Sequence, residues 1–94
     1  MSFNYGLRHG TVLKLTSGSS SSASSAFTAG TEYIRVVGTI ACHIHVAGSP
    51  TATTSTSLLP ANEVEIIKVS PGEKIAVLRI GGSDGELYVT ELSA

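Results

Sequence analysis

Apolar residues alternate with polar ones along most of this 94-residue chain. A period of two residues is typical of β-strands that bury one face, because successive side chains of a strand point to opposite sides. The pattern predicts strands over residues 11–16, 32–37, 39–46, 63–69, 74–80 and 86–92, each bounded by turn residues. Helices are expected to be nearly absent, since the spacing of an amphipathic helix does not recur.

Two turn sequences separate the last three predicted strands. The letters SPGE at 70–73 put Pro71 and Gly72 at the second and third positions of a type II turn, which predicts a tight hairpin. The letters GGSDG at 81–85 predict a looser hairpin into the final strand. With ten glycines and three prolines, these signals predict an all-β fold, a small antiparallel β-sandwich or barrel, jelly-roll-like, of about six to eight short strands.

Two segments interrupt the alternation. Residues 17–26 contain seven serines, which predicts either a flexible, disordered loop or an extended segment lying against a neighbouring subunit. Residues 48–62 are rich in threonine, which favours extended backbone, so a partly ordered edge strand plus a loop is expected there. Residues 1–30, an N-terminal strand or arm and the serine-rich loop, are expected to belong to the same domain as a β-sandwich core at 31–94.

Composition narrows the classes of partner. Charged residues make up 14% of the chain, against about 25% in an average domain, and the net charge is −1. The six basic residues are scattered singly, so we expect no nucleic-acid partner. No apolar run approaches the ~18 residues that span a bilayer, and no signal peptide is evident, so no membrane partner is expected. The single cysteine excludes a disulfide within the chain and suits a reducing cytoplasm.

The stretch ACHIHVAG at 41–48 places the cysteine beside two of the three histidines. In a strand, Cys42 shares a face with Ile44 and Val46, whereas His43 and His45 point to the other side. Cys42 is therefore expected to be a buried apolar residue. His43 and His45 remain weak candidates for metal ligands, because two histidines at i and i+2 can bind one ion.

Gly38 followed by HIH resembles the opening of the metal motif of the cupins, a family of small β-barrels. The resemblance then fails, since no acid follows in VAGSP and no histidine follows PGEK. A third ligand could come only from His9 or from a distant carboxylate such as Glu63 or Glu65, and those two glutamates are expected to lie on a solvated strand face with Val64 and Ile66 buried behind them. We therefore expect no catalytic residue, no metal and no cofactor, with a degenerate cupin-like metal enzyme as the third alternative.

Sheet edges with few charges invite pairing with another chain. The low charge and the alternating Val, Ile and Thr predict a symmetric homo-oligomer, a trimer or dimer, whose subunits exchange strands or arms. Phe3, Tyr5 and Leu7 alternate near the N-terminus and are expected to add a strand to a neighbouring sheet.

Residues 31–94 resemble a group of small virion-associated proteins of tailed bacteriophages. The strings that carry the resemblance are IRVV, CHIHVAGSPTATTS, LLPANEVE, VSPGEKIAVL and ELYVTELS. The resemblance implies a non-enzymatic virion structural protein, made in the host cytoplasm and placed on the capsid surface. It implies in particular a capsid decoration or cement protein that oligomerises and binds the major capsid protein across its junctions.

Under this interpretation the partner-binding residues would lie mainly in segments 1–11 and 17–30, which contact the shell. The final hairpin, with Tyr33 and Ile34, would pack within the oligomer. The candidates are Phe3, Tyr5, Leu7, Ser17, Ser25, Phe27, Tyr33 and Ile34. The alternative is a receptor- or carbohydrate-binding β-module of a phage tail or fibre, although the chain has no tryptophan on which a sugar could stack.

Overall fold

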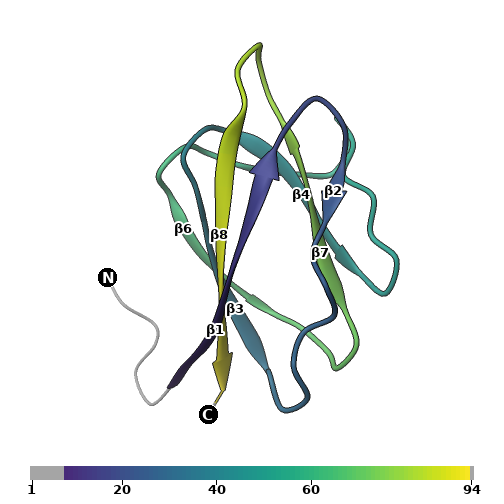
Figure 1. Cartoon of the computed structure of the whole chain (residues 1–94), viewed down its shortest axis with the longest axis vertical. Coiled ribbons are helices and arrows are strands. Elements are labelled where there is room, and N and C mark those ends of the chain that lie inside the picture. Colours follow the sequence, from purple (N-terminus) through teal and green to yellow (C-terminus); the bar gives the residue numbers. More distant parts are fainter. Residues whose placement is uncertain (1–7, 94) are drawn as a thin grey trace.

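A computed structural model describes residues 8–93, of which Arg8 and His9 are described by their backbone alone. This range forms eight β-strands and no helix, so the all-β prediction is confirmed (Figure 1). The strands are β1 Arg8–Ser17, β2 Ser22–Ala23, β3 Tyr33–Gly38, β4 Cys42–Ala47, β5 Ser57–Leu59, β6 Val64–Lys68, β7 Lys74–Arg79 and β8 Gly85–Ser93. The described residues include no helix long and apolar enough to cross a membrane.

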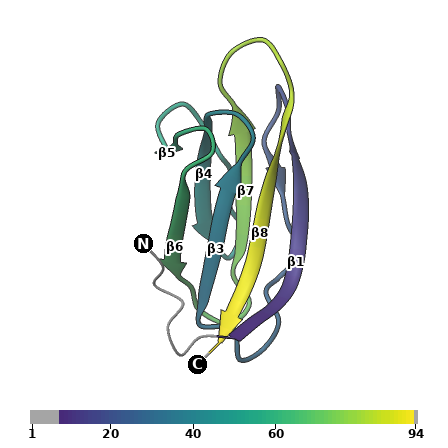
Figure 2. The same ribbon diagram turned by 90° about the vertical axis from the view of Figure 1, so that its left-hand side faces the viewer.

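The strands form two antiparallel four-stranded sheets that stack face to face (Figures 1 and 2). Sheet A has the order β1-β8-β3-β6 and sheet B the order β2-β7-β4-β5. The first strand thus pairs with the eighth, the second with the seventh, the third with the sixth and the fourth with the fifth. This is one long hairpin rolled up so that its pairs alternate between two sheets, which is the jelly-roll arrangement.

The core fills the space between the sheets. Sheet A contributes Ile34, Val36, Leu87 and Val89, and sheet B contributes Cys42, Ile44, Leu59, Ile75 and Val77. These residues occupy every second position of their strands, whereas Tyr33, Arg35 and Val37 of β3 point away from the core and are half-buried. Alternation along the chain therefore places the buried face of β4 correctly, with Cys42 and Ile44 in the core.

The prediction of hairpins at 70–73 and 81–85 is wrong, because the strands on either side of each turn belong to different sheets. The turn at 70–73 does form, since Gly72 has a φ of 83° and the Glu73 N–H donates to the Ser70 carbonyl at 3.2 Å. However, it carries the chain from β6 in sheet A to β7 in sheet B, and 81–85 carries it back to β8 in sheet A. A turn sequence specifies a local reversal, which serves a passage between stacked sheets as well as a hairpin within one.

The serine-rich segment forms hydrogen bonds with β7 of the same chain, so the expectation of a disordered loop is wrong. Ser22 and Ala23 pair with Val77 and Ala76 of β7. Beyond β2, the Ser24 N–H donates to the Ile75 carbonyl at 2.8 Å, and the Phe27 N–H donates to the Glu73 carbonyl at 2.9 Å. Backbone hydrogen bonds hold this edge of sheet B, and they do not depend on the small side chains from which flexibility was predicted.

The two faces of β6 are the reverse of those predicted. Val64 lies opposite Val37 and Ile66 opposite Arg35, on the outer face of sheet A. Glu65 lies opposite Val36 and Ile67 opposite Ile34, on the core side, although Glu65 stays exposed because β6 is an edge strand. Two consecutive isoleucines make both faces of this strand apolar, and Ile67, which packs against the core cluster, decides which one turns inward.

Candidate functional site

His43 and His45 lie on the outer face of sheet B, away from the space between the sheets. They are opposite Leu78 and Ala76 of β7, while the neighbouring Cys42 and Ile44 point into the core. The strand interpretation of ACHIHVAG is therefore confirmed. The side chains of Cys42 and the two histidines cannot meet on one ion, because a strand holds them on opposite sides.

The loop at 48–56, which joins β4 to β5, is attached to this outer face by the two imidazoles. The Thr51 N–H donates to Nδ1 of His45 at 3.2 Å, and Nδ1 of His43 lies 3.1 Å from the Thr56 carbonyl. Because a carbonyl can only accept, Nδ1 of His43 donates there, whereas Nδ1 of His45 accepts. The Ala52 N–H also donates to Oγ of Ser21 at 2.9 Å, and Ala52 itself is buried. The histidines therefore clamp a loop over sheet B.

The possible third ligands named from the sequence lie on the other sheet. His9 belongs to β1 and Glu65 to β6, both in sheet A, and Glu63 directly precedes β6. Within the part of the chain that the structure describes, no three His, Cys, Asp or Glu side chains gather as a metal-ligand set. The arrangement around His43 and His45 thus supplies hydrogen bonds to a loop.

Replacing His45 by alanine is expected to remove the acceptor of the Thr51 N–H. A lost hydrogen bond of about 1 kcal/mol corresponds to a roughly fivefold loss of protection of that amide against hydrogen exchange. His43→Ala is the matched control, since its ring contacts the carbonyl of Thr56 and not the Thr51 amide. Unchanged protection of Thr51 in His45→Ala, measured by NMR, would contradict the clamp.

Cys42 is fully buried between the sheets, as expected for a free cysteine that packs as an apolar residue. Removal from water disfavours the thiolate, and burial raises the pKa of the Cys42 thiol to about 11. A thiol that stays protonated and inaccessible is a poor nucleophile and a poor metal ligand. Cys42 is therefore a core residue.

The raised pKa of Cys42 predicts a loss of stability at alkaline pH. Below about pH 8.5 the thiol is protonated in both states, whereas between about 8.5 and 11 only the unfolded chain releases the proton. The free energy of unfolding should fall over this window by about 2 to 3 kcal/mol from this group alone. The measurement is urea unfolding at several pH values of the parent and of Cys42→Ala. Their difference in stability should shrink toward pH 11, and a constant difference would refute the prediction.

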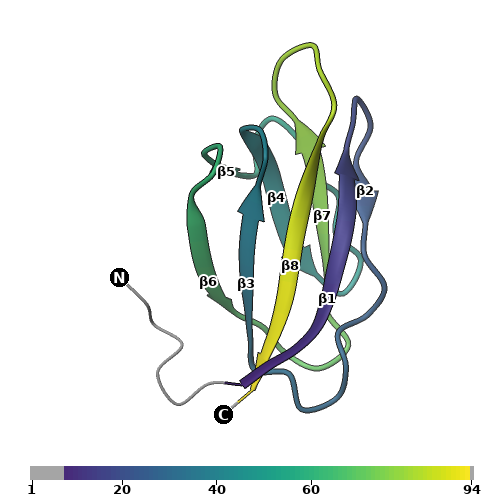
Figure 3. The same ribbon diagram turned by 60° about the vertical axis from the view of Figure 1, so that its left-hand side comes forward.

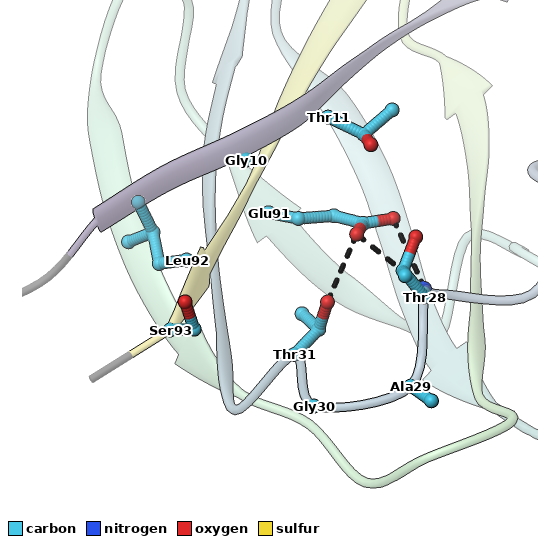
Figure 4. A pocket seen from close by; sticks show the side chains of 9 residues that line it. All are labelled: Gly10, Thr11, Thr28, Ala29, Gly30, Thr31, Glu91, Leu92 and Ser93. Atoms are coloured by element: carbon cyan, nitrogen blue, oxygen red, sulfur yellow. Dashed lines mark hydrogen bonds between the residues drawn. The ribbon is translucent and has the colours of Figure 1, made fainter.

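Glu91 is a buried acidic residue that the sequence analysis did not single out. It lies on the core side of β8 opposite Ile34 and is only 4% exposed. Its Oε1 accepts from the Thr31 hydroxyl at 2.9 Å, and the Thr28 N–H lies 3.4 Å from Oε1 and 3.3 Å from Oε2 (Figure 4). The signal was present, because the alternation that buries Leu87 and Val89 also turns Glu91 inward.

The carboxylate of Glu91 holds together the turn at 28–31. In that turn the Thr31 N–H donates to the Thr28 carbonyl at 3.1 Å, and Gly30 adopts a φ of 92°. Beside it lies a pocket of about 220 Å³, lined by Gly10, Thr11, Thr28, Ala29, Gly30, Thr31, Glu91, Leu92 and Ser93 (Figure 4). This volume is below the ~300 Å³ at which small-molecule sites usually begin, and the acid is already occupied by the turn. We assign Glu91 a structural role.

Apart from Leu58 of sheet B, the large apolar side chains exposed on the strands lie on the outer face of sheet A. Val12 is 60% exposed, Val64 48% and Tyr88 37%. Lys14 forms an ion pair with Glu86 at 3.4 Å, and the Tyr88 hydroxyl donates to Glu86 at 3.2 Å. No comparable loop is attached to this face by hydrogen bonds in the described residues.

The predicted partner-binding residues fall into three groups. Phe3, Tyr5 and Leu7 lie outside the described residues. Ser17, Phe27 and Ile34 are buried, so their side chains belong to the interior of the molecule. Ser25 is exposed and Tyr33 is half-buried on the outer face of sheet A, so these two remain accessible.

The comparisons with known proteins add no relative. No protein-family model matches the chain, and no curated protein and no solved structure matches it significantly.

Proposed function

We propose that this protein is a structural protein of a bacteriophage virion, a capsid decoration or cement protein that binds across junctions of the major capsid protein. The observation that carries the proposal is the outer face of sheet A, which no other segment of residues 8–93 crosses and on which Val12, Val64 and Tyr88 are exposed. The resemblance of residues 31–94 to small virion-associated proteins supports the same role. A homo-oligomer, formed through the sheet edges, would present several such faces at once.

The physical reason is multivalency. A decoration protein meets many equivalent places on a shell, and linking several weak contacts raises the overall affinity by orders of magnitude, about 10² to 10⁴-fold. A sheet face of small and medium apolar side chains supplies weak contacts of this kind. A rigid jelly roll presents such a face at little entropic cost, because its backbone is already ordered.

The fold by itself does not choose among the functions considered. Viral capsid proteins, lectins and cupins all use jelly rolls, and fold does not imply function. The local features favour the structural role, because the histidines clamp a loop, the one buried acid of the described part holds a turn, and the adjoining pocket is small.

The test is titration of the purified protein onto empty shells assembled from the major capsid protein of the phage that encodes it. Binding should saturate at a fixed number of copies per shell, measured by co-sedimentation and located by cryo-electron microscopy. Columns carrying host cell-wall sugars are the comparison arm. Retention on those sugars without binding to shells would favour the receptor-binding module and contradict the proposal.

A further inference from the structure

The two outer faces of the sandwich differ in how they are covered. Across sheet B lies the loop at 48–56, attached by His43 and His45. Sheet A presents β6, β3, β8 and β1 side by side with no segment of the described chain crossing them (Figures 2 and 3). Sheet A therefore offers the broader free surface.

Arg35 lies near the middle of that surface. The register places it between Thr90 of β8 and Ile66 of β6, and Tyr33 and Val37 flank it along β3. The next row contains Tyr88, Val37 and Val64 side by side across three strands. Arg35 is thus surrounded by threonine, tyrosine, valine and isoleucine side chains.

Arg35 has no ion-pair partner among the described residues, unlike two other cations of the sandwich. Arg79 pairs with Asp84, and Lys14 pairs with Glu86 at 3.4 Å. The Arg35 side chain forms no ion pair or hydrogen bond in the described part of the chain, although it is half-buried. A half-buried guanidinium among apolar groups favours a carboxylate, which it can bind through two parallel hydrogen bonds.

The charge of the face indicates what kind of surface covers it. Three basic side chains, Lys14, Arg35 and Lys68, lie on the described outer face with one acidic side chain, Glu86, although the chain as a whole has a net charge of −1. Packing this face on the same face of a second copy would bring like charges together, which is unfavourable. A nucleic acid is also a poor fit, since apolar side chains separate the cations.

We propose that the outer face of sheet A is the surface that docks on the capsid shell, and that the shell presents an acidic side chain to Arg35 within an apolar contact area that includes Val64 and Tyr88. Tyrosine and arginine are among the residues enriched at the energetic centre of protein interfaces. The inference rests on the proposed function and specifies which face performs it.

The experiment compares two pairs of variants in the shell titration. Val64→Asp and Leu58→Asp each place a carboxylate at an exposed apolar position on a short edge strand, the first on the outer face of sheet A and the second on that of sheet B. Arg35→Glu and Lys74→Glu change the net charge equally, again on opposite sheets. The sheet A variants should weaken binding about 10- to 100-fold, and the sheet B variants less than about threefold.

Unfolding midpoints of the four variants serve as the check on folding. The inference is overturned if the parent binds shells and the sheet A variants bind them as tightly as the parent does. It is also overturned if Leu58→Asp, and not Val64→Asp, abolishes binding to the shells. An oligomer that Arg35→Glu, on the internal strand β3, converts to monomers would assign the face to a second copy and would also overturn the inference. Failure of the parent itself to bind shells contradicts the proposed function, so the two failures are distinguishable.

Discussion

Replacing Ile34 by alanine is expected to lower the free energy of unfolding by about 2 to 5 kcal/mol. Ile34 is fully buried on β3, which lies between β8 and β6 in sheet A, and it belongs to the core cluster between the sheets. Truncation removes buried apolar atoms and leaves a cavity that two ordered sheets can close only in part. For a domain of this size each kcal/mol lowers the unfolding midpoint by about 4 to 8 °C.

The matched control for Ile34 is Ile80→Ala. Ile80 has the same side chain but is 40% exposed just beyond β7, so its truncation should cost less than about 1 kcal/mol. Urea unfolding of both variants gives the two values. Equal losses would mean that the core does not lie between sheets A and B as described.

Replacing Glu91 by alanine is expected to cost about 2 to 4 kcal/mol, the second large effect. The change leaves the Thr31 hydroxyl and the Thr28 N–H without the carboxylate that accepts from them, and hydrogen bonds to charged groups are worth more than neutral ones. Part of the loss is offset, because a buried carboxylate also costs free energy to desolvate.

Thr31→Val is the companion variant to Glu91→Ala. It keeps the shape of the side chain and removes only the hydroxyl, so it should cost about 1 to 2 kcal/mol. In a double-mutant cycle with Glu91→Ala, the two effects should be less than additive, since both remove the same 2.9 Å hydrogen bond. Strict additivity would show that Glu91 does not hold the turn at 28–31.

Much of the local structure could be predicted from the residue pattern. The runs at 32–37 and 86–92 were expected to be strands, and the structure has β3 and β8 there. The same rule correctly places Cys42 and His43 on opposite faces of β4. It failed at β6, where Ile66 and Ile67 are adjacent and a period of two no longer identifies one apolar face.

The candidate site was less predictable, because its features depend on contacts between distant segments. Glu91 meets the turn at 28–31 about sixty positions away, and the loop clamp joins His45 to Thr51 only after the chain has turned back over sheet B. The isolated position of Arg35 depends on its neighbours Thr90 and Ile66, which come from two other strands. None of these pairs is adjacent in sequence.

By itself, the sequence determined the class of the fold, the positions of most strands and the burial of Cys42, because alternation and turn residues act through neighbouring side chains. Only the tertiary structure decided that the turn at 70–73 passes between sheets, that Ser22–Ala23 pairs with β7, and that Arg35 lies between Thr90 and Ile66 with no acidic partner in the described part of the chain. The physical reason is that pairing and burial are settled by packing between segments far apart along the chain, where many arrangements satisfy the same local preferences.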